Sequence, residues 1–83
     1  MKNLTDKLQS RGVESLTDEE LIAAIIAEGA SDDKALSIAN ELFAEAGGSL
    51  YRLVATDFPR LRMSSGLGLR RALRLKAAAE LGR

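Results

Sequence analysis

Glycines and helix-capping residues divide almost the whole 83-residue chain into short segments, and each segment carries apolar residues at helical spacing. The stretch Leu16-Thr17-Asp18-Glu19-Glu20 has the form of a capping box, in which Thr17 caps a helix and Glu20 reaches back to it. Ser31 is placed to cap the next helix, whose core-facing stripe is Ala35, Ile38, Ala39, Leu42 and Ala46. No segment alternates apolar and polar residues as a half-buried strand does. The chain is therefore predicted to be all-α.

These glycines and capping residues predict a small bundle of about five or six short helices. The expected elements are 4–11, Thr17 to Gly29, Ser31 to Ala46, a short turn capped by Ser49, a short helix capped by Thr56 with Pro59 in its first turn, and 69–81. On the last helix, one side is predicted to pack inward through Leu69, Ala72, Leu75 and Ala79. Lys76 falls on that apolar side, and its ammonium group is expected to reach water at the rim.

A Gly66-Leu67-Gly68 turn before the last helix has the layout of a helix-hairpin-helix phosphate site. Glycines allow a tight turn and a close ligand, and the amides at a helix N-terminus favour an anion. The predicted phosphate-binding residues, including nearby arginines, are Ser65, Gly66, Leu67, Gly68, Arg70, Arg71, Arg74 and Arg62. Because exposed carboxylates are tolerated near a helix start, Arg70→Glu with Arg71→Glu is expected to change stability little.

The net charge of zero hides a strong asymmetry between the two halves of the chain. Residues 1–48 hold four basic and ten acidic residues, a net charge of −6, whereas residues 49–83 hold eight basic and two acidic residues, a net charge of +6. Seven of the eight cations in the second half are arginine, which matches phosphate geometry. The pattern favours a polyanion partner for the basic half. The alternatives are a solvated face and mutual attraction of the halves.

A faint internal repeat relates the two halves at an offset of 37 residues: Gly29, Ala35, Leu36 and Ile38 align with Gly66, Ala72, Leu73 and Leu75. It predicts one helical domain, 1–83, with a first hairpin unit at about 17–46 and a second at about 56–82. Asp32 and Asp33 follow the first turn and would repel a phosphate there. The first, degenerate unit is therefore predicted to be structural.

Composition narrows the function further. The chain has no cysteine and no histidine, and its acidic pairs stand at helix starts, where capping explains them, so no enzyme activity, metal or cofactor is expected. No apolar run approaches the ~20 residues of a membrane span, and no signal segment opens the chain. A cytoplasmic location without membrane contact is expected. Only three aromatic residues argue against a base-stacking single-strand binder.

The chain resembles the N-terminal domain of RadC-type bacterial proteins, which were once described as DNA-repair proteins. The matching stretches are Asp6-Lys7-Leu8 into Arg11-Gly12, Leu16 to Leu21, Ala39 to Leu42, Gly47-Gly48, Gly66-Leu67-Gly68 and Ala77 to Arg83. The resemblance implies a downstream metalloprotease-like domain, whose zinc ligands include paired histidines that this chain lacks. It also implies an excised domain or a truncated product. Two positions before the first glycine of the hairpin, the family usually has a large apolar residue, whereas this chain has Ser64.

These observations predict an accessory module that binds DNA without sequence specificity, through backbone phosphates at the second hairpin. The alternative is a docking module that positions the downstream metalloprotease-like domain and does not bind DNA directly.

Overall fold

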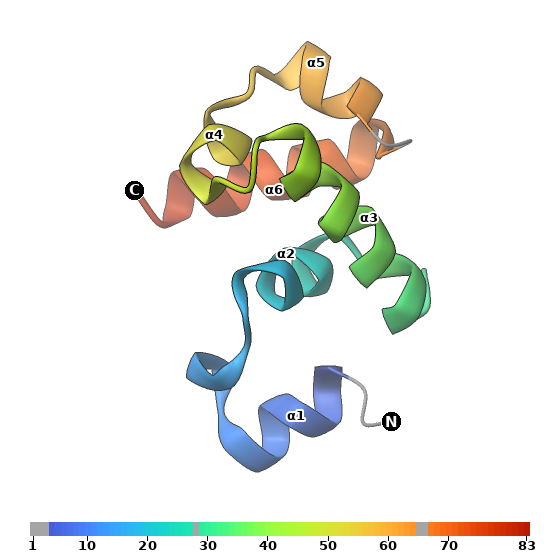
Figure 1. Ribbon diagram of the computed structural model, residues 1–83, viewed down its shortest axis with the longest axis vertical. Coiled ribbons are helices and arrows are strands. Elements are labelled where there is room, and N and C mark those ends of the chain that lie inside the picture. The colour runs from blue at the N-terminus through green and yellow to red at the C-terminus, as the bar shows by residue number, and fades with distance from the viewer. Residues whose placement is uncertain (1–3, 28, 65–66) are drawn as a thin grey trace.

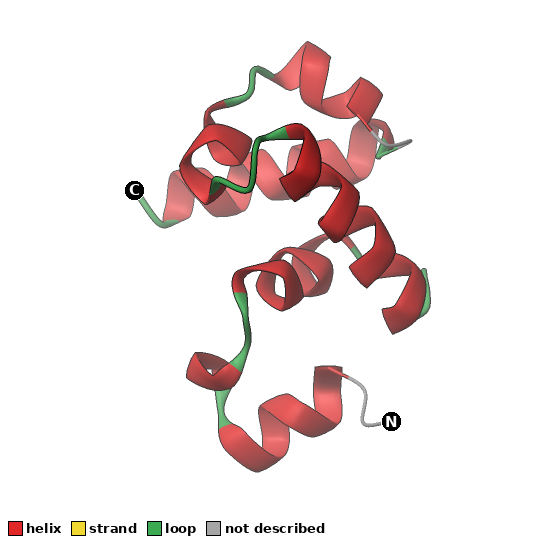
Figure 2. Ribbon diagram, in the orientation of Figure 1, coloured by secondary structure: helices red, strands yellow, loops and turns green. Residues whose placement is uncertain are grey.

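The computed structural model describes residues 4–27, 29–64 and 67–83, and these residues form helices joined by short turns, with no strand among them (Figure 2). Six α-helices follow in chain order: α1 (Leu4–Arg11), α2 (Asp18–Ile26), α3 (Asp32–Glu45), α4 (Leu50–Ala55), α5 (Phe58–Met63) and α6 (Gly68–Leu81). A single 3-10 turn, Val13–Ser15, lies between α1 and α2. The predicted all-α fold is confirmed.

Four of these helices begin where a side chain caps them. The capping box is present, since the Glu20 amide donates to Thr17 Oγ1 (3.2 Å) and the Thr17 amide donates to Glu20 Oε1 (2.8 Å). Ser31 and Ser49 cap α3 and α4 as predicted. The cap of α5 is Asp57 instead of Thr56, because Thr56 still belongs to the end of α4. Pro59 lies in the first turn of α5 as expected.

The core lies among α2, α3 and α6, with single buried leucines from α1, α4 and α5. Ile26, Leu42, Leu61, Leu67 and Leu75 are the largest side chains withdrawn from solvent. The repeat is visible in this core, because Ala35 and Ala72, which align in the sequence, are both completely buried. Small residues at these points allow close approach of the neighbouring helix. Figure 1 shows α6 running behind α3 and α4, while α2 lies next to α3.

Helix α1 lies apart from α4, α5 and α6, on the far side of α2 (Figure 1). Two polar contacts join it to the rest: the amide of Leu4 donates to Asp32 Oδ2 (2.7 Å), and Lys7 Nζ donates to Glu20 Oε1 (2.8 Å). The hydrogen bond from Lys7 is the main cause that lowers the pKa of Glu20, and the Thr17 amide adds to it. The α1 helix is therefore held to the start of α3 and the start of α2.

One expectation for α6 is wrong. Leu69 does not pack inward, since 52% of it is exposed. The ammonium group of Lys76, which is partly buried, donates to the backbone carbonyls of Val54 and Thr56, both at 2.9 Å. A cation at the carboxyl end of a helix is favoured by the helix dipole, and Lys76 holds the end of α4 against α6.

Candidate nucleic-acid interface

The predicted phosphate turn lies between α5 and α6. Its described part begins at Ser64, where α5 ends, and resumes at Leu67; Ser65 and Gly66 lie outside the described residues. The Leu67 side chain is 1% exposed, and its amide donates to the carbonyl of Ser64 (2.8 Å). Leu67 therefore anchors the turn to the core. Its amide is engaged within the protein, and its predicted part in phosphate binding stays a prediction.

Gly68 is the first residue of α6 and has a φ of +83°, a backbone conformation that side-chain-bearing residues rarely adopt. It is exposed, and a Cβ placed on it would have open space around it. The glycine is thus required by the backbone angle and not by crowding. Open space at this point also leaves room for a ligand at the start of α6.

The start of α6 differs from those of α2, α3, α4 and α5. Each of those four helices has a side-chain oxygen that accepts a hydrogen bond from a first-turn amide, whereas Leu67, in the N-cap position of α6, has none to offer. The first-turn amides of any helix lack intrahelical partners, and the positive end of the helix dipole lies at the same place. An oxyanion can accept hydrogen bonds from such amides.

Three of the four predicted arginines border this helix start with exposed side chains. Arg62 lies in the last turn of α5, and Arg70 lies in the first turn of α6. Arg74 is one turn further along α6, on the side of the helix that carries Arg70. The fold thus brings both flanks of the turn and its cations to one end of α6.

Arg71 differs from these three arginines. Its side chain is half-buried, and its Nε donates to the backbone carbonyl of Ile26 (2.8 Å), the last residue of α2. A cation at this position satisfies a terminal carbonyl and interacts favourably with the negative end of the α2 dipole. The guanidinium of Arg71 therefore links α6 to the end of α2. Replacing Arg71 is expected to change the stability of the protein.

The corresponding start of α3 is occupied by the protein itself. Ser31 Oγ accepts from the amide of Lys34 (3.2 Å), and the Asp32 carboxylate accepts from the amide of Leu4. A carboxylate that holds α1 leaves this helix start with negative charge already in place. The structural role of the first unit stays a prediction.

The basic residues that brace the fold were missed by reading the sequence alone. Arg71 and Lys76 both donate to carbonyl groups at the ends of other helices. The one available signal was the position of Lys76 among the apolar residues of α6. That position indicated a buried stem. The partner carbonyls, however, belong to Val54 and Thr56, which are 22 and 20 residues away in the chain, and no local pattern indicates them.

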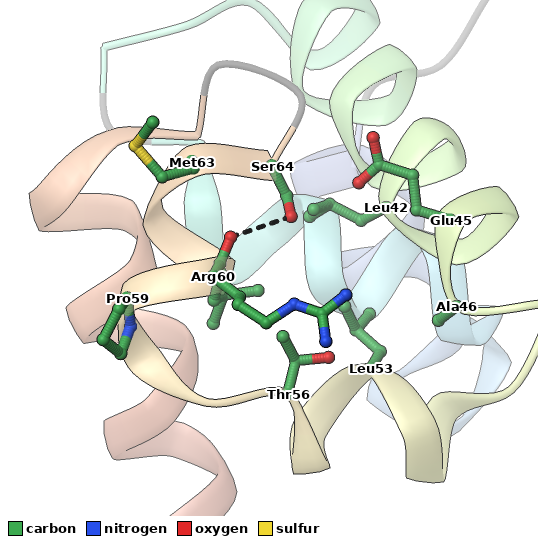
Figure 3. Close-up of a pocket in the computed structure, with 10 residues that line it drawn as sticks. Leu42, Glu45, Ala46, Leu53, Thr56, Pro59, Arg60, Met63 and Ser64 are labelled. Carbon is green, nitrogen blue, oxygen red and sulfur yellow. Dashed lines mark hydrogen bonds between the residues drawn. The ribbon is translucent and has the colours of Figure 1, made fainter.

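A groove of about 600 Å³ lies between the end of α3, α4 and α5. Figure 3 shows the Arg60 side chain extended across it, above Leu53 and Thr56, with Leu42 on the far wall. Glu45 lies on the same rim, so the groove pairs a cation with a carboxylate. This mixed charge makes it a poorer phosphate site than the start of α6.

Two other kinds of site are absent from the described residues. Within them, no group of three or more histidine, cysteine, aspartate or glutamate side chains is placed to hold a metal ion. None of the described helices has the length and apolar character needed to cross a membrane.

Comparison with known proteins gives one family. The family described as UPF0758 N-terminal matches residues 4–73. A UPF0758 protein of Syntrophomonas wolfei is 37% identical over 78 residues, which cover 94% of this chain and 33% of that protein. A UPF0758 protein of Chloroflexus aurantiacus is also 37% identical over 78 residues, covering 94% of this chain and 34% of that protein. The chain thus spans about a third of the length of these relatives. No solved structure gave a significant match.

Proposed function

This chain belongs to the UPF0758 N-terminal family, the family of the RadC-type proteins, and on that premise we propose that it is an accessory module that binds the DNA backbone without sequence specificity. The observation that carries the proposal is the start of α6. It combines a positive-φ glycine, a helix N-terminus without a capping side chain, and the exposed arginines Arg62, Arg70 and Arg74.

In this proposal a phosphate oxygen accepts hydrogen bonds from first-turn amides of α6, beside Gly68. Arg70 and Arg74 lie along one side of α6 and contact phosphates next to the first, while Arg62 does so from α5. Such contacts carry no sequence information, since base edges are not read. Arg71 is left out of the binding set because it holds the end of α2, and Leu67 contributes a fixed turn instead of an amide.

The proposal also includes what the chain does not do and where it acts. The chain itself has no catalytic activity, because it lacks cysteine and histidine and its acidic pairs lie at helix starts. It needs no cofactor. Its location is the cytoplasm of a bacterial cell, where DNA is present. A DNA-repair role is part of the same proposal and depends on DNA binding.

A salt titration with mixed-sequence duplex DNA tests the proposal. If three or four phosphates are neutralised, log affinity against log salt should fall with a slope of about −3, and the dissociation constant should be ~10⁻⁴ to 10⁻⁶ M. Arg70→Glu with Arg74→Glu should abolish binding at low salt. The matched control is Arg11→Glu with Lys34→Glu, which makes the same charge change at exposed sites on α1 and α3.

Thermal melting of both double variants shows whether each one is folded. A folded Arg70→Glu, Arg74→Glu variant that binds DNA as well as the parent would contradict the phosphate site. An equal loss of DNA binding in the control variant would mean that DNA binding depends only on the net charge of the chain.

The alternative function is docking of a second, metalloprotease-like domain with no direct DNA contact. The observation that favours it is the length of the relatives, of which this chain matches about a third. Failure of the parent chain to bind duplex DNA at low salt would select this alternative.

A further inference from the structure

The groove between the end of α3, α4 and α5 has apolar side chains at its base and on one wall. The buried Leu42, Leu53 and Leu61 form the base, and Pro59 and the exposed Met63 line the α5 wall. The volume of about 600 Å³ is within the range of small-molecule pockets, which combine a mainly apolar lining with a few polar groups. The groove therefore has a size and lining that suit the apolar part of a small molecule.

One cation lies over this groove. The Arg60 side chain extends across it, and Figure 3 shows no hydrogen bond from the guanidinium to Glu45 or to any other lining residue. No ion pair between described residues involves Arg60. A guanidinium binds a carboxylate through two parallel hydrogen bonds. Arg60 is therefore placed to bind a carboxylate on a molecule whose apolar part lies on the leucines.

The two hydroxyl groups that line the groove donate to the protein itself. Thr56 Oγ1 donates to the carbonyl of Arg52 (2.9 Å), and Ser64 Oγ donates to the carbonyl of Arg60 (3.1 Å). Toward a ligand, both hydroxyls can therefore act only as acceptors. Of the described side chains that line the groove, Arg60 is thus the one with N–H groups to offer.

Glu45 limits the charge that a ligand can carry. It lies on the same rim as Arg60, and its carboxylate repels any negative charge that enters the groove. Arg60 can offset one negative charge, but it cannot also offset the second charge of a phosphate monoester. The two side chains together favour a single carboxylate over a phosphate group.

The walls of the groove are short compared with a helix of another protein. Helices α4 and α5 have six residues each, a length of about 9 Å. A docked helix is about 10–12 Å wide with its side chains and makes contacts over several turns. These dimensions therefore fit a small molecule better than a second polypeptide.

We propose that this groove binds a small amphipathic carboxylate, a molecule with one carboxylate group and an apolar body such as an alkyl chain. The guanidinium of Arg60 pairs with the carboxylate at the mouth of the groove. The alkyl chain covers the leucines at the base, next to Met63. The proposal does not depend on DNA binding, because Arg60 is outside the set of residues proposed to contact phosphates.

The test is a titration followed by the chemical shifts of backbone amides in solution NMR. Octanoate is the probe, and it should bind with a dissociation constant of about 1 mM or lower. Octanamide, which has the same chain without the charge, should bind about fivefold more weakly. Octyl phosphate should also bind more weakly, because its second charge meets Glu45. The amides that shift should include those of Ala46 and Thr56, while those of α1 stay unchanged.

Variants separate the two parts of the groove. Arg60→Gln should weaken octanoate binding by about fivefold and leave octanamide binding unchanged, because only octanoate uses the cation. Arg11→Gln is the matched control, since Arg11 is an exposed arginine on α1, on the far side of α2 (Figure 1). It should bind both molecules like the parent. Met63→Gln should weaken both to the same degree, because it changes the apolar wall. Thermal melting should show that each variant is folded.

Several results would overturn the proposal. They are no saturation by octanoate up to roughly 10 mM, equal affinities of the parent for octanoate and octanamide, or an equal loss of octanoate binding in the Arg11→Gln variant. Tighter binding of octyl phosphate than of octanoate would assign the groove to phosphate ligands. Tighter binding of a short peptide that ends in leucine would assign it to the C-terminus of another protein. The comparison of octanoate with octanamide uses the parent chain alone and so needs no variant to fold.

Octanoate binding and DNA binding can fail separately. The Arg70→Glu, Arg74→Glu variant should bind octanoate like the parent, because both positions are outside the groove. Octanoate binding by a parent chain that does not bind duplex DNA would contradict only the proposed function. DNA binding by a parent chain that does not bind octanoate would contradict only the carboxylate site.

Discussion

Arg71 and Arg74 are one turn apart on α6 and have the same charge, yet their environments differ. Arg71 donates to the carbonyl of Ile26 from a half-buried position, whereas Arg74 is exposed. Arg71→Glu removes this contact and places a carboxylate near the negative end of α2. It should lower the free energy of unfolding by about 1–3 kcal/mol. Arg74→Glu should lower it by less than Arg71→Glu does, because Arg74 is exposed.

Urea unfolding followed by circular dichroism measures both values. Equal effects of the two substitutions would contradict the bracing role of Arg71. The structure thereby overturns the expectation that glutamates at positions 70 and 71 leave stability nearly unchanged.

Gly68 gives a second prediction at the scale of single residues. Its φ of +83° strains any side chain with a Cβ, and a β-branched one most, although the surrounding space is open. Gly68→Val should therefore lower stability by about 1–3 kcal/mol. Gly68→Asn should cost clearly less, because asparagine adopts positive φ more readily. If a steric clash were the cause, asparagine, whose side chain extends further from the backbone than that of valine, would not be expected to be clearly milder. Thermal melting of the two variants decides between the causes.

Among the helices, α1 has the weakest attachment. The Asp32 carboxylate accepts from the first amide of α1, and Lys7 pairs with Glu20, so removal of one contact loosens the whole element. Asp32→Ala should raise amide hydrogen exchange throughout Leu4–Arg11, while the amides of α2, α3 and α6 in the core stay protected. The control is Asp33→Ala, which removes an exposed carboxylate one position along. Equal exchange in the two variants would show that Asp32 does not hold α1.

The Lys7–Glu20 contact also makes the attachment of α1 dependent on pH. The pKa of Glu20 is lowered below its ordinary value of 4.5, first by the hydrogen bond from Lys7. The folded state therefore favours the charged carboxylate, and the stability that this contributes is complete above pH 4.5. It is lost as the pH falls below that value and through the lowered pKa.

Lys7→Met should flatten this part of the profile of unfolding free energy against pH, because the hydrogen bond that lowers the pKa of Glu20 is gone. Urea unfolding at a series of acidic pH values supplies the profile. A parent and variant with the same slope below pH 4.5 would contradict this account.

For the whole molecule, local signals in the sequence predicted most of the fold. The Thr17–Glu20 capping box, the Ser31 and Ser49 caps and the boundaries of α1 depend on neighbouring residues, and all are confirmed. The assignment of α5's cap to Thr56 failed by one residue, because Thr56 and Asp57 are both good caps and α4 uses the first as its end.

Contacts between distant parts of the chain were not predictable in the same way. Arg71 meets Ile26 across 45 residues, and Lys76 meets Val54 across 22. Helical spacing says which side of a helix a residue lies on, but not which carbonyl of another helix is within reach. For this reason the sequence wrongly placed Leu69 in the core and did not indicate the contact between Arg71 and Ile26. The phosphate site at the start of α6 stays a prediction.

The contacts of α6 have a consequence for synthesis of the protein. Helix α6 packs against α2, α4 and α5, and it supplies the cations that hold the ends of α2 and α4. During translation the ribosome releases α2 to α5 before α6. These earlier helices then present the apolar surfaces that α6 later covers, so the nascent chain is exposed to chaperones and proteases until α6 emerges. Ribosome stalling with α6 still inside the exit tunnel should thus leave a protease-sensitive chain, and stalling on an extended chain that has brought α6 out of the tunnel a resistant one.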